Sequence, residues 1–249
     1  MHPVSILIPT YARTQHLEEA IRSALDQRYD GEFDVVVLND CPWQTLSCAD
    51  RRVTIFNNPE PFRTLGDKRN ALLALGRQDW AVWLDDDDLI LPHHLSRMMA
   101  VPRAEPLCLA VKSTISWFKV GMPPRPVEWR EAAVSMEVAC RRHDGLFCGG
   151  FDSIDSGEDQ SFTARLAATG CMTVLNKGPP SYVYCWSNGV HHISGSGRPI
   201  ASDWFRAEAD RRRREGMEPE GAIEIMPRFH RDYVTGAPSL VRDGLGLRR

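Results

Sequence analysis

Four consecutive aspartates, at positions 85–88, directly follow the apolar run at residues 80–84. An apolar run of this kind predicts a buried strand, and ligands usually bind beyond the carboxyl ends of strands in an open α/β sheet. Two unit charges about 4 Å apart repel by about 4 kcal/mol near a protein surface, so a bound cation would relieve the crowding. Mg²⁺ and Mn²⁺ prefer such oxygen ligands and commonly bridge carboxylates to substrate phosphates. The run therefore predicts a metal–phosphate site, with capping of a helix begun by Pro92 as the alternative.

The first hundred residues alternate between strand and helix patterns. Apolar runs predict strands at residues 4–8, 33–38, 53–56 and 80–84, and helical spacing predicts helices from an N-cap at Thr14 and over residues 66–75. This alternation is typical of an α/β protein with a mainly parallel sheet. Three strands run into polar residues, Thr10, Asp40 and Asp85, which we expect to meet at one edge of the sheet.

The second half of the chain is less regular. Strand patterns cover residues 107–120 and 181–186, helical patterns cover 159–168 and 203–215, and loop patterns cover 121–126 and 194–197. Glycine and proline are scattered through the last segment. We therefore expect residues 201–249 to form a C-terminal helix followed by a loosely docked tail.

The bulk properties are those of an ordinary globular protein. The formal net charge is −3, so no general attraction to nucleic acid or to an anionic membrane is expected. The seven cysteines form neither Cys-x-x-Cys pairs nor a regular disulfide spacing. A signal-peptide core is missing, and no apolar run approaches the ~20 residues of a membrane-spanning helix. We therefore expect a cytoplasmic protein without a transmembrane segment.

Five blocks in a fixed order give a more specific signal. They are residues 4–11 (VSILIPTY), 39–40 (ND), 68–70 (KRN), 84–88 (LDDDD), and 149–152 (GGFD) followed by 157–159 (GED). On these blocks the chain resembles the family 2 glycosyltransferases over approximately residues 3–192. The resemblance implies the GT-A fold: a Rossmann-like, mainly parallel α/β sheet flanked by helices, with a smaller antiparallel acceptor-side portion. It also implies that residues 1–200 form one domain, with a nucleotide-sugar-binding half (1–100) and an acceptor half (101–200).

The resemblance further implies metal-dependent, inverting transfer of a sugar from a nucleoside diphosphate sugar to an acceptor hydroxyl. Asp87 would bind Mn²⁺ or Mg²⁺, which counters the charge that grows on the departing diphosphate. Asp159 would be the general base of a single displacement, and Glu158 would orient its surroundings. The donor would be held by Pro9, Thr10, Tyr11, Arg13, Asp40, Lys68, Arg69, Asp85 and Asp86.

Each of these roles has a structural alternative. Tyr11 could simply pack in the core, Arg13 could be a solvated residue at a helix entry, and Asp40 could cap a turn. Lys68 and Arg69 could lie on an exposed helical face. Glu158 and Asp159 could be acids that favour the start of a helix. Many enzymes of the GT-A fold complete the metal site with a late histidine, so the resemblance makes His191 or His192 a second candidate ligand. An ordinary surface or core histidine is an equal alternative for either position.

Departures from the family pattern limit what the resemblance implies. Cys41 and Pro42 stand where the family often has Gly-Ser, so the donor base stays open, with a uridine diphosphate sugar favoured. The Gln-x-x-Arg-Trp signature of processive synthases is absent, which favours single addition. No landmark follows His192, so the acceptor (a glycan, a small molecule or modified DNA) and the oligomeric state stay open.

Other functions remain as alternatives. The arginines at residues 211–214 could contact DNA phosphates in an enzyme that glycosylates a modified base, although nearby acids also suit a solvated mixed-charge helix. A nucleotidyltransferase would share the nucleotide and metal, but usually has a glycine-rich basic loop where this chain has Pro9-Thr10-Tyr11. A haloacid-type phosphatase, or a non-catalytic sugar- or calcium-binding module, would use the acidic run alone.

Overall fold

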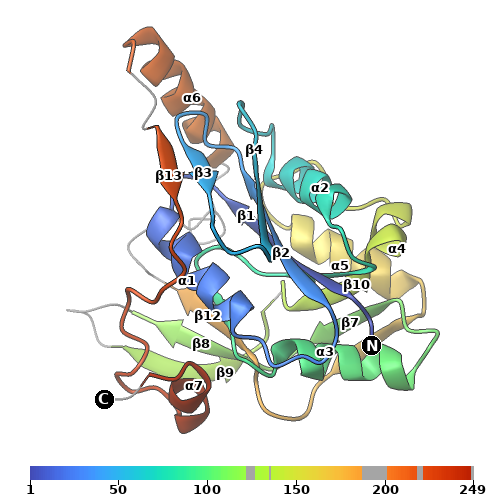
Figure 1. Cartoon of the computed structure of the whole chain (residues 1–249). Helices are drawn as coiled ribbons and strands as arrows, with labels where there is room; N and C mark the ends of the chain where they lie inside the picture. The colour runs from blue at the N-terminus through green and yellow to red at the C-terminus, as the bar shows by residue number, and fades with distance from the viewer. Residues whose placement is uncertain (122–126, 135, 187–200, 218–220, 248–249) are drawn as a thin grey trace.

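The computed structural model is built around a seven-stranded sheet (Figure 1). Its strands are β1 (Val4–Thr10), β2 (Phe33–Asn39), β4 (Val53–Asn57), β5 (Trp80–Trp83), β7 (Ala110–Ser113), β10 (Val138–Arg141) and β11 (Met172–Leu175). They lie in the order β11-β7-β10-β5-β1-β2-β4, and only β10 runs antiparallel to its neighbours. The structure describes residues 1–121, 127–134, 136–186, 201–217 and 221–247.

Helices cover both faces of this sheet (Figure 1). They are α1 (Thr14–Leu25) and α3 (His94–Ala104) on one face, and α2 (Leu65–Leu75), α4 (Arg142–Phe147) and α5 (Glu158–Ala168) on the other. Successive side chains of a strand point to opposite faces. Ile6 and Ile8 of β1 therefore pack with Leu17 of α1, whereas Leu7 packs with Leu72 of α2. The α/β class and the mainly parallel, helix-flanked sheet are confirmed.

A smaller sheet stands beside the large one. It contains β6 (Leu89–Ile90), β8 (Ser116–Val120), β9 (Glu128–Ala132) and β12 (Tyr182–Trp186), in the order β6-β12-β8-β9. Two of its pairings are antiparallel and the β12–β8 pairing is parallel. The four aspartates connect β5 of the large sheet to β6 of the small one, so they lie at the junction of the two sheets.

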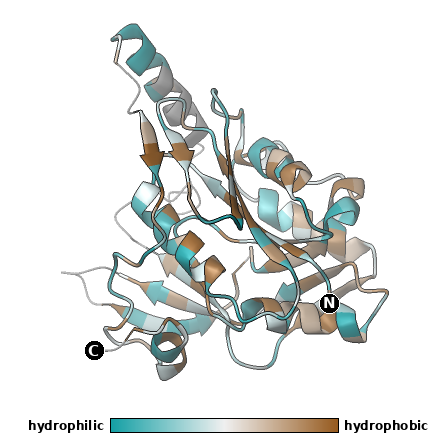
Figure 2. Ribbon diagram, in the orientation of Figure 1, coloured by the Kyte–Doolittle hydropathy of each residue, from teal (hydrophilic) through white to brown (hydrophobic). Residues whose placement is uncertain are grey.

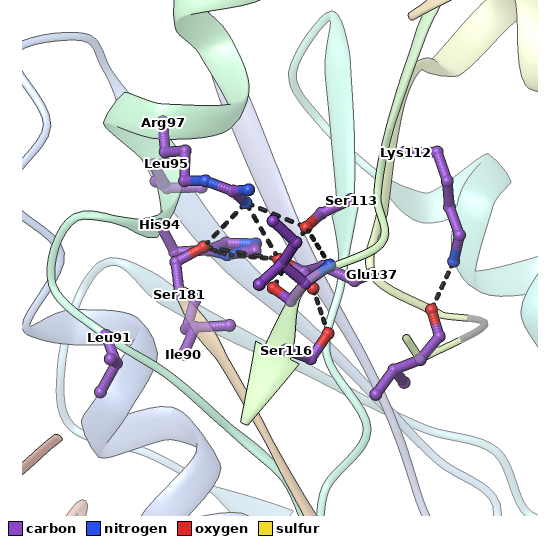
Figure 3. Close-up of polar contacts among 12 residues, drawn as sticks. Ile90, Leu91, His94, Leu95, Arg97, Lys112, Ser113, Ser116, Glu137 and Ser181 are labelled. Atoms are coloured by element: carbon purple, nitrogen blue, oxygen red, sulfur yellow. Dashed lines mark hydrogen bonds and ion pairs between the residues drawn. The ribbon is translucent and has the colours of Figure 1, made fainter. Parts of the chain in front are cut away.

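A buried polar network links residues of the large sheet to residues of the smaller one (Figure 3). At its centre is Glu137, which is fully buried just before β10. Ser116 of β8 donates a hydrogen bond to Glu137, and Arg97 of α3 and Ser181 lie 3.4 Å from its Oε1 atom. His94 lies 2.9 Å from Ser181 through its Nδ1 atom. Burial raises the pKa of Glu137 to about 7, although the Ser116 hydrogen bond and Arg97 oppose that shift.

Two element boundaries show what local sequence patterns miss. The predicted N-cap, Thr14, is the first residue of α1, and Arg13 takes the cap position without a side-chain cap bond. Helix α2 has a cap that was not expected, because Thr64 accepts a 3.1 Å hydrogen bond from the backbone N–H of Asp67.

The C-terminal segment corrects one expectation. After α6 (Ala201–Arg214), strand β13 (Ala222–Glu224) pairs with β3 (Thr45–Ser47), and α7 (Ser239–Gly244) follows. Tyr233 and Val241 are fully buried in a cluster with Leu89 and Val183. The C-terminal segment is therefore anchored at these residues rather than loosely docked, because partners far away in the sequence bury their side chains.

Helix α6 projects from the rest of the molecule (Figure 1), and its last turns are strongly hydrophilic (Figure 2).

Within the ranges that the structure describes, no helix combines the length and the apolar character that crossing a membrane requires.

Candidate active site

Three strand ends meet at the carboxyl edge of the large sheet, as the parallel topology predicts. The hydroxyl of Thr10, at the end of β1, donates a 2.7 Å hydrogen bond to Asp86, which follows β5. Lys68 of α2 donates to the carbonyl of Thr10 at 2.6 Å and to the Asp40 carboxylate, beyond β2, at 2.5 Å. The other oxygen of Asp40 accepts from the backbone N–H of Phe62 at 2.9 Å. Asp40 thus links separate segments instead of capping a local turn.

Arg13 lies directly against the acidic run. Its guanidinium donates to both oxygens of Asp86 and, at 2.9 Å, to Oδ2 of Asp87. The residue before it, Ala12, has a φ of 55°, a left-handed conformation that is costly for a side-chain-bearing residue. Burial raises the pKa of Asp86 to about 6, and the charge of Arg13 opposes the shift. The strained turn therefore places the Arg13 guanidinium against the neighbouring carboxylates of Asp86 and Asp87.

The last aspartate of the run differs from the others. Asp88 is fully buried and accepts 2.8 Å hydrogen bonds from the Tyr182 hydroxyl and the Cys185 backbone N–H, both in β12. Burial raises its pKa well above the ordinary value, with the neighbouring charge of Asp87 adding to the effect. Helix α3 begins at His94 with His93 in the cap position, so capping by Asp88 is ruled out. Asp88 fastens the acidic run to the smaller sheet.

Arg69 joins the acidic run to the Glu-Asp pair at the start of α5. Its side chain donates to Asp85 at 2.9 Å and to Glu158 at 3.3 Å. Its guanidinium carbon lies 5.6 Å from the ring centroid of Trp83 and 5.9 Å from that of Phe151. Burial raises the pKa of Glu158 to about 7, and Arg69 opposes that shift. Lys68 and Arg69 are both buried, so the exposed-face alternative for them is wrong.

Two of the sequence blocks lock together next to this contact. The Asn70 side chain donates to the carbonyl of Phe151 at 2.8 Å and accepts from its backbone N–H at 2.7 Å. A Cβ atom on Gly150 would come within 2.2 Å of the Asn70 Oδ1 atom, and Gly150 has a φ of 62°. Glycine is therefore required for the loop before α5 to approach α2 this closely.

Asp159 follows Glu158 in the first turn of α5. Its Oδ1 atom accepts a 2.8 Å hydrogen bond from the backbone N–H of Gln160, and the residue is partly exposed. Glu158 is buried, and its contact with Arg69 places the first turn of α5 beside the acidic run. A partly exposed and a buried carboxylate thus occupy adjacent positions at the start of α5.

An aromatic cluster joins the loop after β1 to the loop after β2. The rings of Tyr11 and Trp43 pack edge to face, with centroids 5.5 Å apart, and both residues are buried. Burial raises the pKa of the Tyr11 hydroxyl. Arg212 of α6 lies over the Trp43 ring, 4.2 Å from its centroid. Pro9 is a buried residue of β1. These contacts give Tyr11 a packing role, and the sequence analysis did not anticipate Trp43.

The arginine run of α6 is interleaved with acids. Arg211 pairs with Glu208 at 2.7 Å and also with Glu215, and Arg213 pairs with Asp210 at 3.2 Å. These i,i+3 and i,i+4 contacts are those of a solvated mixed-charge helix, which they favour over a nucleic-acid surface.

A metal ion would find oxygen ligands at Asp87. Among the residues with a described placement, no group of three or more His, Cys, Asp or Glu side chains is arranged to hold a metal. His191 and His192 lie outside the described residues. Mg²⁺ and Mn²⁺ accept one or two carboxylates together with substrate phosphates, so the aspartates suit an ion that arrives with its diphosphate.

Comparisons with known proteins find relatives of this chain. The family model described as glycosyl transferase family 2 matches residues 5–131. An uncharacterized glycosyltransferase of Haemophilus influenzae is 26% identical over 201 residues, which cover 73% of this chain and 67% of that protein. A putative colanic acid biosynthesis glycosyl transferase of Escherichia coli, WcaA, is 30% identical over 106 residues, which cover 39% of this chain and 37% of that protein.

Solved structures share the fold. Staphylococcus aureus TarS 1-349 in complex with UDP-GlcNAc has a TM-score of 0.59 at 17% identity, covering 89% of this chain and 74% of that one. The mannosyltransferase PcManGT from Pyrobaculum calidifontis, in complex with GDP-Man and Mn²⁺, has a TM-score of 0.52 at 19% identity, covering 84% of this chain and 73% of that one. At these identities the similarity establishes the GT-A architecture alone.

Proposed function

The chain belongs to glycosyl transferase family 2, and on that basis we propose that it transfers a sugar from a nucleoside diphosphate sugar to an acceptor hydroxyl, one sugar at a time and with inversion. The main support is the contact of Arg69 with both Asp85 and Glu158. It brings the acidic run at a strand end next to the Glu-Asp pair that starts α5. A donor and the general base that activates its acceptor need that proximity.

The donor would lie along the strand ends. Asp40 would hold the base or ribose: two hydrogen bonds engage its carboxylate, and a carboxylate offers about four acceptor positions. Thr10, Lys68 and Arg13 fix the walls of this site through their mutual contacts and those with Asp86. Pro9 and Tyr11 would shape the base end by packing.

The diphosphate would lie against the acidic run. Asp87 would hold Mn²⁺ or Mg²⁺ together with phosphate oxygens, and the bound ion counters the negative charge that develops on the leaving group. Asp85, whose side chain is 24% exposed, would face the ribose or the donor sugar. Arg13 contacts Asp86 and Asp87 and would add positive charge beside the leaving diphosphate.

Asp159 would act as the general base. Its partly exposed carboxylate would take the proton from the acceptor hydroxyl as that oxygen attacks the anomeric carbon. The nucleoside diphosphate leaves without protonation, so a second catalytic carboxylate of the kind that glycosidases use is unnecessary. Glu158, which is buried against Arg69, would keep the start of α5 in place.

We favour a uridine diphosphate sugar as donor and leave the acceptor open. The two structural neighbours are complexes with UDP-GlcNAc and GDP-Man, so both bases belong in the first screen. The nucleotidyltransferase alternative loses support from the family membership, and the DNA alternative loses it from the acids paired with the arginine run.

A thermal-shift screen tests this proposal. The protein would be melted with UDP, GDP, ADP and CDP, each with and without Mn²⁺. A nucleotide present at a hundred times its dissociation constant should stabilise the fold by ~2.7 kcal/mol. A single nucleotide that raises the melting temperature further with Mn²⁺ is expected, and unchanged melting across the panel would overturn the proposal.

A further inference from the structure

Arg231, in the C-terminal segment, contacts the acidic run. Its Nη2 atom donates a 3.0 Å hydrogen bond to the backbone carbonyl of Asp87, the proposed metal ligand. Arg231 lies far outside the part of the chain that the family model matches, residues 5–131. The C-terminal segment therefore contributes a side chain to the edge of the donor site.

Glu19 of α1 holds Arg231 in this position. The Glu19 carboxylate is buried and accepts hydrogen bonds from the side chain of Arg231, from the backbone N–H groups of His230 and Arg231, and, at 2.8 Å, from the hydroxyl of Tyr233. The Arg231 guanidinium also lies 5.4 Å from the centroid of the Tyr233 ring. These hydrogen bonds to the Glu19 carboxylate hold the Arg231 guanidinium in a fixed position.

One nitrogen of the Arg231 guanidinium makes no hydrogen bond to the residues that the structure describes. That atom, Nη1, is buried without such a bond. The same holds for the Nε2 atom of His16 in α1, whose pKa is lowered to about 4 by burial, with the charges of Arg231 and Arg13 adding to the shift. Buried polar atoms without partners are rare, and each one calls for an explanation such as a ligand or an ion.

We propose that Arg231 is a diphosphate-binding residue of the donor site, held beside Asp87 by Glu19. This inference rests on the proposed function, because it names a further residue of the same site. Arg13 and Arg231 then flank Asp87 from two chain segments, and together they supply two fixed guanidinium groups. Guanidinium forks suit phosphate oxygens better than ammonium groups do.

A neighbouring arginine provides a matched control. Arg228 lies in the same segment and pairs with Glu18 of α1 at 3.3 Å, but its side chain is 58% exposed. If these arginines served only to fasten the segment to α1, replacing either should affect nucleotide binding to a similar small extent.

The test compares a nucleoside diphosphate with its nucleoside. Affinities for UDP and GDP would be measured by calorimetry with Mn²⁺ present, and those for uridine and guanosine by ligand-observed NMR, on the wild-type chain, Arg231→Gln and Arg228→Gln. Arg231→Gln should weaken binding of the diphosphate at least about tenfold, as loss of a charged hydrogen bond implies. Its nucleoside affinity should stay within about twofold, and Arg228→Gln should leave both affinities unchanged.

If Arg231→Gln fails to fold, Arg231→Lys replaces it. An ammonium group cannot keep the Glu19 and Asp87 contacts and reach a phosphate as well, so the same selective loss is expected. Equal losses for diphosphate and nucleoside, or no loss, would overturn the role of Arg231 while leaving the proposed function intact. A wild-type chain that binds none of UDP, GDP, ADP and CDP would overturn the proposed function itself.

Discussion

Asp85 and Glu158 accept hydrogen bonds from the same guanidinium, that of Arg69, although 72 residues separate them in the chain. Arg69 is almost fully buried and lies beside the packed rings of Trp83 and Phe151. A buried cation placed between two carboxylates holds them together, and its removal leaves their charges uncompensated. This contact therefore governs both the stability of the fold and the geometry of the site.

Replacing Arg69 should be strongly destabilising. Arg69→Leu leaves Asp85 and Glu158 without their shared partner, so we expect the free energy of unfolding in urea to fall by about 3–5 kcal/mol. The control is Arg63→Leu, because the Arg63 side chain is 72% exposed and pairs with Asp67 at the surface. That variant should change stability by less than about 0.5 kcal/mol. Equal effects of the two substitutions would contradict the linking role of Arg69, whereas Glu158→Gln should partly rescue Arg69→Leu.

Asp159→Asn should remove turnover and spare binding. A positioned general base commonly contributes about 10²–10⁴-fold to the rate, so kcat for sugar transfer should fall by that factor. The affinity for the nucleoside diphosphate should stay within about twofold, because the donor contacts lie on other elements. Asp243→Asn on α7 is the control and should leave kcat unchanged. A variant at Asp159 with full activity would exclude it as the base, whereas a wild-type chain that binds the nucleotide but shows no turnover would reopen the non-catalytic binding module.

The sequence predicted the half of the fold in which neighbouring elements pair. Strands β1, β2 and β5 are short apolar runs separated by helical patterns, and local pattern is enough to place them in a parallel sheet. The acidic run was found in the same way, because it follows an apolar strand pattern, whereas the Glu-Asp pair was found through its place among the ordered family blocks. Their contact through Arg69 needed the structure.

Other features depend on residues that are distant in the sequence. Strand β10 enters the large sheet between β5 and β7, and nothing in its own four residues specifies antiparallel pairing there. Glu19 falls within a helical pattern, yet it is buried by partners more than 200 positions later. Two adjacent acids beside the apolar face of α1 were the only sign in the sequence that α1 has polar partners elsewhere in the chain. The scattered glycines and prolines of the C-terminal segment obscured it.

Asp87 and Asp88 should respond differently to the same substitution. Asp88 is held by Tyr182 and Cys185 in the smaller sheet, whereas Asp87 contacts Arg13. Asp87→Asn should abolish the additional stabilisation that Mn²⁺ gives in the presence of UDP, because a neutral amide is a poorer ligand for a hard cation. Asp88→Asn should lower the melting temperature but retain the Mn²⁺ effect. The reverse pattern in thermal-shift measurements would assign the metal to Asp88.

The network around Glu137 should make stability depend on pH. Burial raises the pKa of Glu137 in the folded protein to about 7, above the ordinary value of 4.5. A raised folded-state pKa means that the folded protein binds this proton more tightly than the unfolded chain does. The corresponding stabilisation is fully present below pH 4.5 and is lost as the pH rises through 7. Glu137→Gln has no such proton, so it removes this dependence.

The measurement is the difference in unfolding free energy between the wild-type chain and Glu137→Gln, from urea titrations at several pH values. Other titrating groups affect both proteins similarly and largely cancel in the difference. The wild-type advantage should shrink between pH 4.5 and 7.5 by up to about 3 kcal/mol. Two cations oppose this trend, Arg97 at 3.4 Å and the nearby Lys112. A wild-type advantage that grows with pH would show that pairing with these cations outweighs the cost of burying the charge, and would reverse the assigned direction of the pKa shift.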